Sequence, residues 1–145
     1  MAEGSTSDVI ELVLADRPDV FEHLSSAHAA AAEVVDPRLL GLCTARVAML
    51  LGLDPEASPA LDADTLDALS TWPDNPEFSE TERACLAFTE QFVVDVANIP
   101  DELAEPVVEA VGPDGFANFV TALLVNEQRI RLRLIWDRVL DGDPT

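Results

Sequence analysis

The chain has 145 residues, of which 48% are hydrophobic, and its 28 acidic side chains outnumber its 8 basic ones, giving a formal charge of −20. This length and composition predict one domain with a buried core, spanning residues 1–145, and exclude a disordered, collagen-like or disulfide-scaffold protein. The negative charge would repel polyanions, so we expect neither nucleic acid nor an anionic membrane surface as a partner.

The apolar content bears on assembly and location. The mean hydropathy is slightly positive despite the charge, so we expect apolar surface that a monomer of this size does not hide and therefore a homo-oligomer. No apolar run approaches the roughly 18 residues of a membrane span, and no export signal is visible. The sequence thus predicts a cytoplasmic protein without membrane contact.

Helix start and stop signals follow one another along the whole chain. Pro18 and Pro37 suit the first turn of a helix, Ser79 and Glu82 have the spacing of a capping box, and Gly52 suits a helix end. The predicted helices cover residues 8–16, 18–35, 37–51, 62–71, 80–97, 101–111 and 114–140, the last ending before Gly142. We therefore predict an all-α bundle of about six to seven helices.

Three ionisable side chains fall inside otherwise apolar helix faces. They are His28, Arg46 and Glu127. An unpaired buried charge costs several kcal/mol, so each needs a partner, a wet pocket or a shifted protonation state. One hypothesis places the three around a common cavity. The alternatives are structural: Glu127 paired with Arg131 four residues on, His28 in a core hydrogen bond, and Arg46 bound to a carboxylate.

Other reactive side chains fit simpler interpretations. His23 projects away from the apolar face and lies five residues from His28, which is not the spacing of a helical metal site, so we expect no metal. Cys43 and Cys85 belong to no CxxC pair and project onto apolar faces, which predicts core packing rather than redox chemistry. Lysine is absent, which excludes Schiff-base catalysis.

Short motifs spread over residues 18–138 carry a family resemblance. The clearest is Phe78-Ser79-Glu80-Thr81-Glu82-Arg83-Ala84. The others, in order, are Pro37-Arg38-Leu39-Leu40, Ala45-Arg46-Val47-Ala48, Leu69, Trp72, Ile99-Pro100-Asp101-Glu102 and Asn126. Together they resemble the alkylhydroperoxidase D (AhpD)-like and carboxymuconolactone decarboxylase superfamily. The resemblance implies a helical family core over residues 18–140 after an N-terminal extension, assembled into dimers, trimers or hexamers.

The chain departs from the peroxidase branch of that family at its reactive centre. There the resemblance implies a glutamate, a CxxC pair and a histidine. The matching positions hold Gly41, Leu53, Glu56 and Ala60. A dithiol peroxidase needs a low-pKa thiolate beside a resolving thiol, so this chain is not expected to be one. The decarboxylase branch works without CxxC but is matched less well, and its Asn-Arg pair is only partly present as Asn126 and Arg129.

The sequence supports three functional hypotheses. The first is a cofactor-independent lyase, decarboxylase or isomerase acting on a small carboxylate or carbonyl compound. Its catalytic residues would be His28 and Glu127, and its substrate-binding residues Arg46, Asn126 and Arg129. The second is a noncatalytic oligomeric binding or structural protein of the same fold. The third is residual thiol antioxidant activity.

Overall fold

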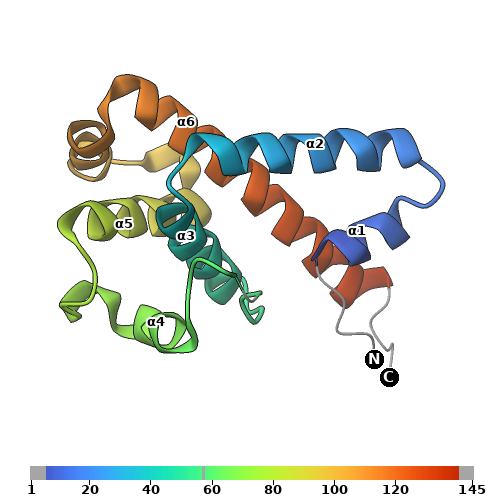
Figure 1. The fold of residues 1–145 in the computed structure, drawn as a ribbon, viewed down its shortest axis with the longest axis horizontal. Helices are drawn as coiled ribbons and strands as arrows, with labels where there is room; N and C mark the ends of the chain where they lie inside the picture. Colours follow the sequence, from blue (N-terminus) through green and yellow to red (C-terminus); the bar gives the residue numbers. More distant parts are fainter. Residues whose placement is uncertain (1–5, 57, 141–145) are drawn as a thin grey trace.

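The computed structural model describes residues 6–56 and 58–140, with the backbone alone at residue 140. Over these residues the chain is helical, without a strand, and has one isolated bridge between Ser58 and Leu61. The elements are α1 (Thr6–Val13), α2 (Pro18–Val34), α3 (Pro37–Leu50), α4 (Ala63–Ala68), η1 (Leu69–Asp74), α5 (Glu80–Val94), η2 (Val96–Asn98), α6 (Asp101–Ile135) and η3 (Trp136–Leu140) (Figure 1). The all-α prediction is confirmed for the described residues; Gly142 lies outside them.

Side chains cap the N-termini of α3, α4 and α5, and these helices begin where the sequence predicts. Asp36 and Asp62 accept hydrogen bonds from backbone N–H groups three residues on, at 3.0 and 2.8 Å. Ser79 and Glu82 form a reciprocal capping box, with bonds of 3.0 and 3.1 Å. These side chains satisfy N–H groups that have no partner inside the helix. Gly52, with φ +80°, takes the positive-φ position that the sequence predicts after α3.

The predicted and observed elements differ where nonlocal contacts or backbone geometry intervene. In the described chain α1 already includes Thr6, two residues before the predicted start, and the carboxylate of Glu56 accepts the Thr6 N–H. The predicted helix 62–71 divides into α4 and the tighter η1, which contains Pro73. The predicted break between the helices 101–111 and 114–140 is confirmed at Gly112, where φ is +80° and ψ is 165°, so α6 consists of two helical segments that meet at a sharp bend.

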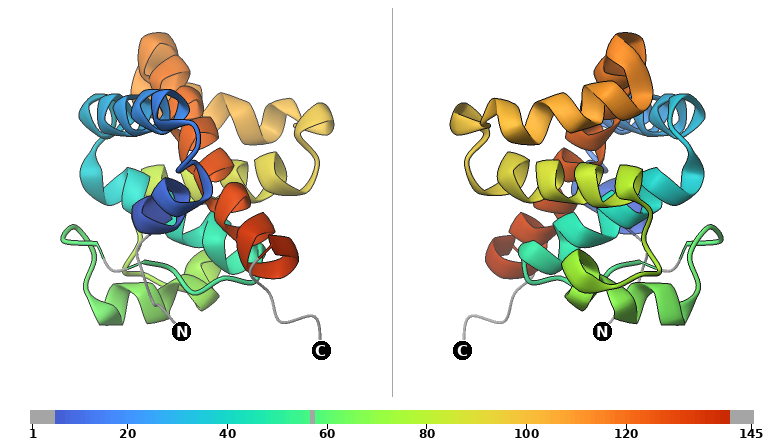
Figure 2. Two further views of the ribbon diagram at one scale, coloured as in Figure 1. Left: turned by 90° about the vertical axis from the view of Figure 1, so that its right-hand side faces the viewer. Right: turned by 90° about the vertical axis from the view of Figure 1, so that its left-hand side faces the viewer.

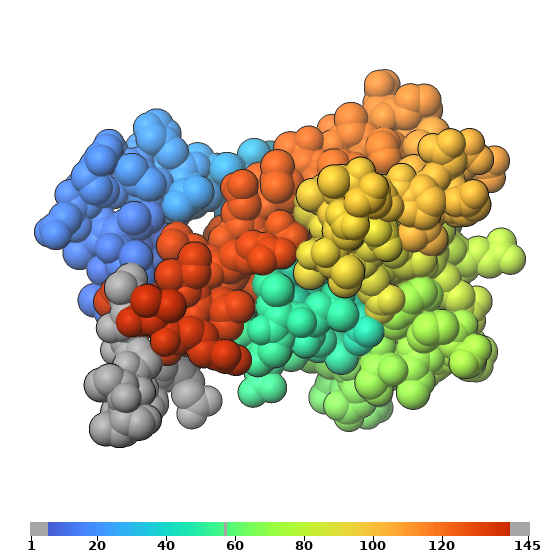
Figure 3. Space-filling view, turned by 180° about the vertical axis from the view of Figure 1, so that it is seen from behind, coloured from blue at the N-terminus to red at the C-terminus, as the bar shows by residue number. Residues whose placement is uncertain are grey.

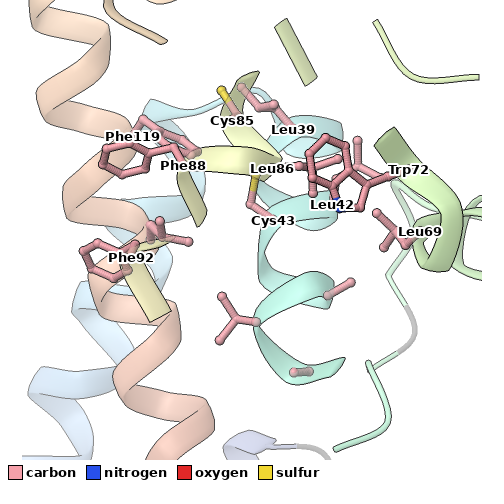
Figure 4. Close-up of a cluster of buried hydrophobic side chains, with 14 of the residues drawn as sticks. Leu39, Leu42, Cys43, Leu69, Trp72, Cys85, Leu86, Phe88, Phe92 and Phe119 are labelled. Carbon is pink, nitrogen blue, oxygen red and sulfur yellow. The ribbon is translucent and has the colours of Figure 1, made fainter. Parts of the chain in front are cut away.

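Helix α6 is the centre of the arrangement. It contacts α1, α2, α3 and α5, and α3 also packs on α5. Figures 1 and 2 show α6 crossing the molecule between these helices, with α1 against its C-terminal half. Most of the core lies among α3, η1, α5 and α6 (Figure 4). Its fully buried members include Leu42, Leu69, Leu86, Phe119 and Leu123.

Length and composition alone give α6 a second interpretation. Among the described residues, the segment Asp101–Val139 is long and apolar enough to cross a membrane. Core helices of soluble proteins meet the same criterion, so the observation is weak evidence for a span. In the structure 22% of the apolar stretch is buried, and α6 bends at Gly112 and packs on four other helices.

Candidate functional site

A chain of polar side chains links α2, α6 and α3. His28 is half-buried on α2, and its Nδ1 lies 3.0 Å from Oδ1 of Asn126 on α6. The Asn126 Nδ2 donates to Oγ1 of Thr44 on α3, also at 3.0 Å. Because an amide oxygen only accepts, Nδ1 of His28 carries the hydrogen and donates it. In the neutral ring, Nε2 is then the unprotonated nitrogen, able to accept a proton.

Arg129 lies beside this chain, almost one turn after Asn126. It is 8% exposed, and its guanidinium donates to Oγ of Ser7 on α1 at 2.6 Å. Within residues 6–56 and 58–140 it forms no ion pair with a carboxylate. Burial lowers its pKa, while the negative charge of Glu56 acts in the opposite direction. The result is a largely buried guanidinium whose charge is only partly balanced by its neighbours.

The protonation of His28 depends on these surroundings. Burial is the largest cause lowering its pKa, and the positive charge of Arg129 is the next. The hydrogen bond to Asn126 and the charge of Glu56 act in the opposite direction but do not reverse the shift. The ring is therefore neutral at neutral pH. We call His28, Thr44, Glu56, Asn126 and Arg129 the His28 cluster.

Glu56 reaches the cluster from the loop that follows α3. Its carboxylate accepts the backbone N–H of Thr6 and lies 3.7 Å from the guanidinium of Arg133. Its side chain is 46% exposed, so this edge of the cluster is in contact with solvent. Glu56 thus joins Thr6 of α1 to α6 and supplies negative charge that acts on Arg129.

Arg46 lies in a separate polar group. Its Nε donates to Oε2 of Glu90 at 2.7 Å, and the indole Nε1 of Trp72 donates to the same oxygen at 2.8 Å. This geometry agrees with the structural alternative, in which Arg46 is bound to a carboxylate. The contact connects α3, α5 and η1 rather than α2 and α6.

Glu127 is also held apart from the His28 cluster. It is 7% exposed, and its Oε2 lies 3.4 Å from the guanidinium of Arg131, the partner that the sequence predicts. Glu127 lines a surface pocket of about 610 Å³ at the end of α5. Its side chain makes no hydrogen bond to His28, Asn126 or Arg129 among the described residues.

The structure thus brings together three of the five predicted site residues: His28, Asn126 and Arg129. The hypothesis of one cavity shared by His28, Arg46 and Glu127 finds no support, because the three side chains have separate partners. Glu127 lines the pocket at the end of α5 without the other two, and none of the three lines the pocket between α2 and α6. A second pocket, of about 300 Å³, lies between α2 and α6. The space-filling view shows a hollow there, between the N-terminal helices in blue and α6 in red (Figure 3).

Sequence reasoning missed Thr44, Ser7 and Glu56. Thr44 stands next to Cys43 within an apolar helix, and a single threonine there carries no distinctive signal. Ser7 contacts Arg129, and Glu56 contacts Thr6, through the docking of α1, which periodicity does not reveal.

The two cysteines lie in the core, as predicted. Both are fully buried and free. Burial raises the pKa of both thiols, and that of Cys85 reaches about 12. Because the thiolate is the reactive form, neutral thiols at these positions disfavour antioxidant activity.

Comparisons with protein-family models, with curated proteins and with solved structures found no match for this chain.

Proposed function

We propose that the protein is a cofactor-independent enzyme of lyase, decarboxylase or isomerase type that acts on a small carboxylate or carbonyl compound at the His28 cluster. One observation carries this proposal: a neutral histidine is fixed by Asn126 next to a largely buried guanidinium that has no ion pair among the described residues. A base beside a cation is the pair of groups that proton abstraction next to a carbonyl requires.

The geometry suggests a division of labour. Nε2 of His28 would take a proton from the carbon next to the carbonyl group. The electrons of the broken C–H bond would move to the carbonyl oxygen, where the positive charge of Arg129 would stabilise the enolate. The imidazolium would then return the proton to the product. Asn126 and Thr44 are positioning residues, since they hold the histidine ring in one tautomer and orientation.

We also propose a distant relationship to the AhpD-like and carboxymuconolactone decarboxylase superfamily. The order of the resembling motifs and the helical architecture support it. Glu56, which matches a position of the peroxidase motif, belongs to the His28 cluster, so the candidate site includes the region where the family carries its reactive centre. A polar acid–base site would then stand in place of the thiol chemistry.

A homo-oligomer in the cytoplasm remains part of the proposal. Large apolar side chains are exposed on α1 and at the C-terminal end of the described chain. Leu12 is 62% exposed, Ile135 51% and Val139 70%. Contact with other copies would remove this apolar surface from water.

The test is solvent-proton exchange in a panel of small 3-oxo acids and 2-oxo acids, followed by ¹H NMR in heavy water. We expect the protein to accelerate exchange or carbon dioxide release for at least one compound. His28→Gln should lose at least about 100-fold in rate, the usual contribution of general acid–base catalysis. Arg129→Met should lose a similar factor through the missing charge stabilisation.

A matched control uses the other histidine. His23 is exposed on the same helix, so His23→Gln should retain the full rate. Equal rates for His23→Gln and His28→Gln would refute the assignment of the base.

A noncatalytic binding or structural protein is the second candidate. The pairing of Arg46 with Glu90 and of Glu127 with Arg131 favours it, because two of the five predicted site residues already have structural partners. Saturable binding of a panel compound without exchange would support this candidate.

A further inference from the structure

We infer that the pocket at the end of α5 binds a small organic ammonium ion with an apolar body. This pocket, which we call the α5 pocket, lies between the C-terminus of α5, η2 and α6. Figure 3 shows the end of α5 and η2, in yellow, directly against α6, in orange-red. Its volume of about 610 Å³ falls within the range of small-molecule sites. It is separate from the His28 cluster and does not depend on the proposed function.

The wall of the α5 pocket is apolar and exposed to solvent. Val94 is 74% exposed, Val96 60% and Leu124 42%. Phe92 lines the same pocket and is buried. Such exposed side chains would gain about 25 cal/mol for each Å² that a ligand removes from water. The wall therefore favours a ligand with a hydrocarbon or aromatic body.

One buried carboxylate lies in this apolar surrounding. The Glu127 side chain is 10% exposed, and its charged partner within the described chain is Arg131. Their separation of 3.4 Å is longer than the 2.7–2.9 Å of a strong charge-assisted hydrogen bond. The Arg131 side chain is 45% exposed and would keep its hydration if it turned away. A ligand ammonium group would replace it on Glu127 with a shorter bond.

The charge of the molecule selects a cation over an anion. The chain carries a formal charge of −20, which attracts cations and repels anions at long range. Asp95 adds a second carboxylate to the pocket lining. The Arg131 guanidinium is directed at Glu127 and at the carbonyl oxygen of Val93, so it offers an incoming carboxylate a poor site.

The test is a methyl-NMR titration of the full chain with phenethylammonium chloride, at about pH 7.5 and physiological salt, where long-range attraction is screened beyond roughly 8 Å. We expect saturable shifts of the Val94 and Val96 methyl signals. Glu127→Gln should bind at least about tenfold more weakly, because it loses a hydrogen bond to a charged group. Arg131→Met should bind up to about fivefold more tightly, because the competing ion pair is gone.

Three controls separate this site from general attraction to an acidic protein. Glu109→Gln removes an exposed carboxylate elsewhere on α6 and should leave the affinity unchanged. The neutral 2-phenylethanol and the anionic 3-phenylpropionate should bind at least about tenfold more weakly than the ammonium ion. Circular dichroism should show that each variant keeps the helical content of the parent protein.

The inference is overturned if Glu127→Gln binds as tightly as the parent protein, if Glu109→Gln weakens binding equally, or if 2-phenylethanol binds as well as the ammonium ion. It is also overturned if the Val94 and Val96 signals shift with protein concentration in the absence of ligand. That result would make this face a contact between copies of the chain.

Discussion

Replacing Glu90 with leucine tests whether Arg46 is a structural residue. The Glu90 Oε2 atom accepts from both Arg46 and Trp72, at 2.7 and 2.8 Å. Glu90→Leu removes this acceptor and leaves two donors without it. The Arg46 side chain is 20% exposed and Trp72 is 7% exposed, so water replaces the lost acceptor only in part.

The expected loss of stability follows from these exposures. A buried donor left without an acceptor costs about 1–3 kcal/mol, which applies to the Trp72 indole. The ion pair lies between the roughly 0.2–1 kcal/mol of an exposed pair and the roughly 3–5 kcal/mol of a fully buried one. We expect a total of about 2–4 kcal/mol. For 145 residues, with an unfolding entropy of about 0.3 kcal/mol/K, this lowers the Tm by about 7–13 °C.

Calorimetry and urea denaturation of a double-mutant cycle provide the measurement. The cycle combines Glu90→Leu with Trp72→Phe, which removes the indole donor but keeps an aromatic ring. The two substitutions should be coupled by at least about 0.5 kcal/mol, as expected for residues in one network. A loss below about 1 kcal/mol for Glu90→Leu, or strictly additive effects, would show that the shared acceptor does not support the fold.

Three further predictions concern single groups. The folded-state pKa of His28 is lowered, so the unfolded chain binds more protons below about pH 6.5 and stability falls as the pH decreases. Urea denaturation of the parent protein and of His28→Gln from about pH 7.5 to 5.5 should show that the parent loses more unfolding free energy. The extra loss is at most about 1.4 kcal/mol per pH unit, and it is smaller because solvent screens the half-buried ring. Identical stability profiles for the two proteins would contradict the prediction. Gly112→Ala should lower the unfolding free energy by about 1–3 kcal/mol, because φ +80° with ψ 165° suits glycine alone. The new methyl group meets no atom within 4 Å, so the loss would come from backbone strain and not from a steric clash. An unchanged Tm in thermal unfolding would show that the bend relaxes. Cys43 and Cys85 should react with a thiol reagent at about pH 8 only after denaturation, because burial keeps both thiols protonated; rapid labelling of the native protein would refute this.

The helices were predictable where a short sequence determines them. Asp36, Asp62 and the Ser79–Glu82 pair cap their helices through side chains that bond backbone groups three residues away, so the signal and its effect are adjacent in the sequence. The start of α1 was not predictable in this way. Thr6, the first described residue of α1, donates its N–H to Glu56, 50 residues further along the chain, and a contact between such distant residues leaves no local signal.

The candidate site was predictable in part for a related reason. Helical periodicity places a residue on the inward face, and His28, Arg46 and Glu127 are indeed half-buried or buried. Helical periodicity does not show which neighbouring residue the end of a long side chain contacts. Arg46 and Glu127 have flexible side chains that find carboxylate or guanidinium partners on α5 or on their own helix. The histidine ring has a short reach, and it bonds Asn126, which lies on the α6 helix that packs directly against α2.

This difference in reach explains why the His28 cluster is the better candidate for chemistry. Long charged side chains at a helix surface neutralise one another during folding, so their presence on an inward face is weak evidence of a site. Arg129 does not follow this pattern: it is more buried than Arg46 and yet donates to a hydroxyl group rather than to a carboxylate among the described residues. A buried cation without a paired anion lowers the stability of the fold, and a bound anion would remove this cost. A bound carboxylate or enolate would supply that anion, and binding one should therefore raise the Tm of the parent protein but not that of Arg129→Met.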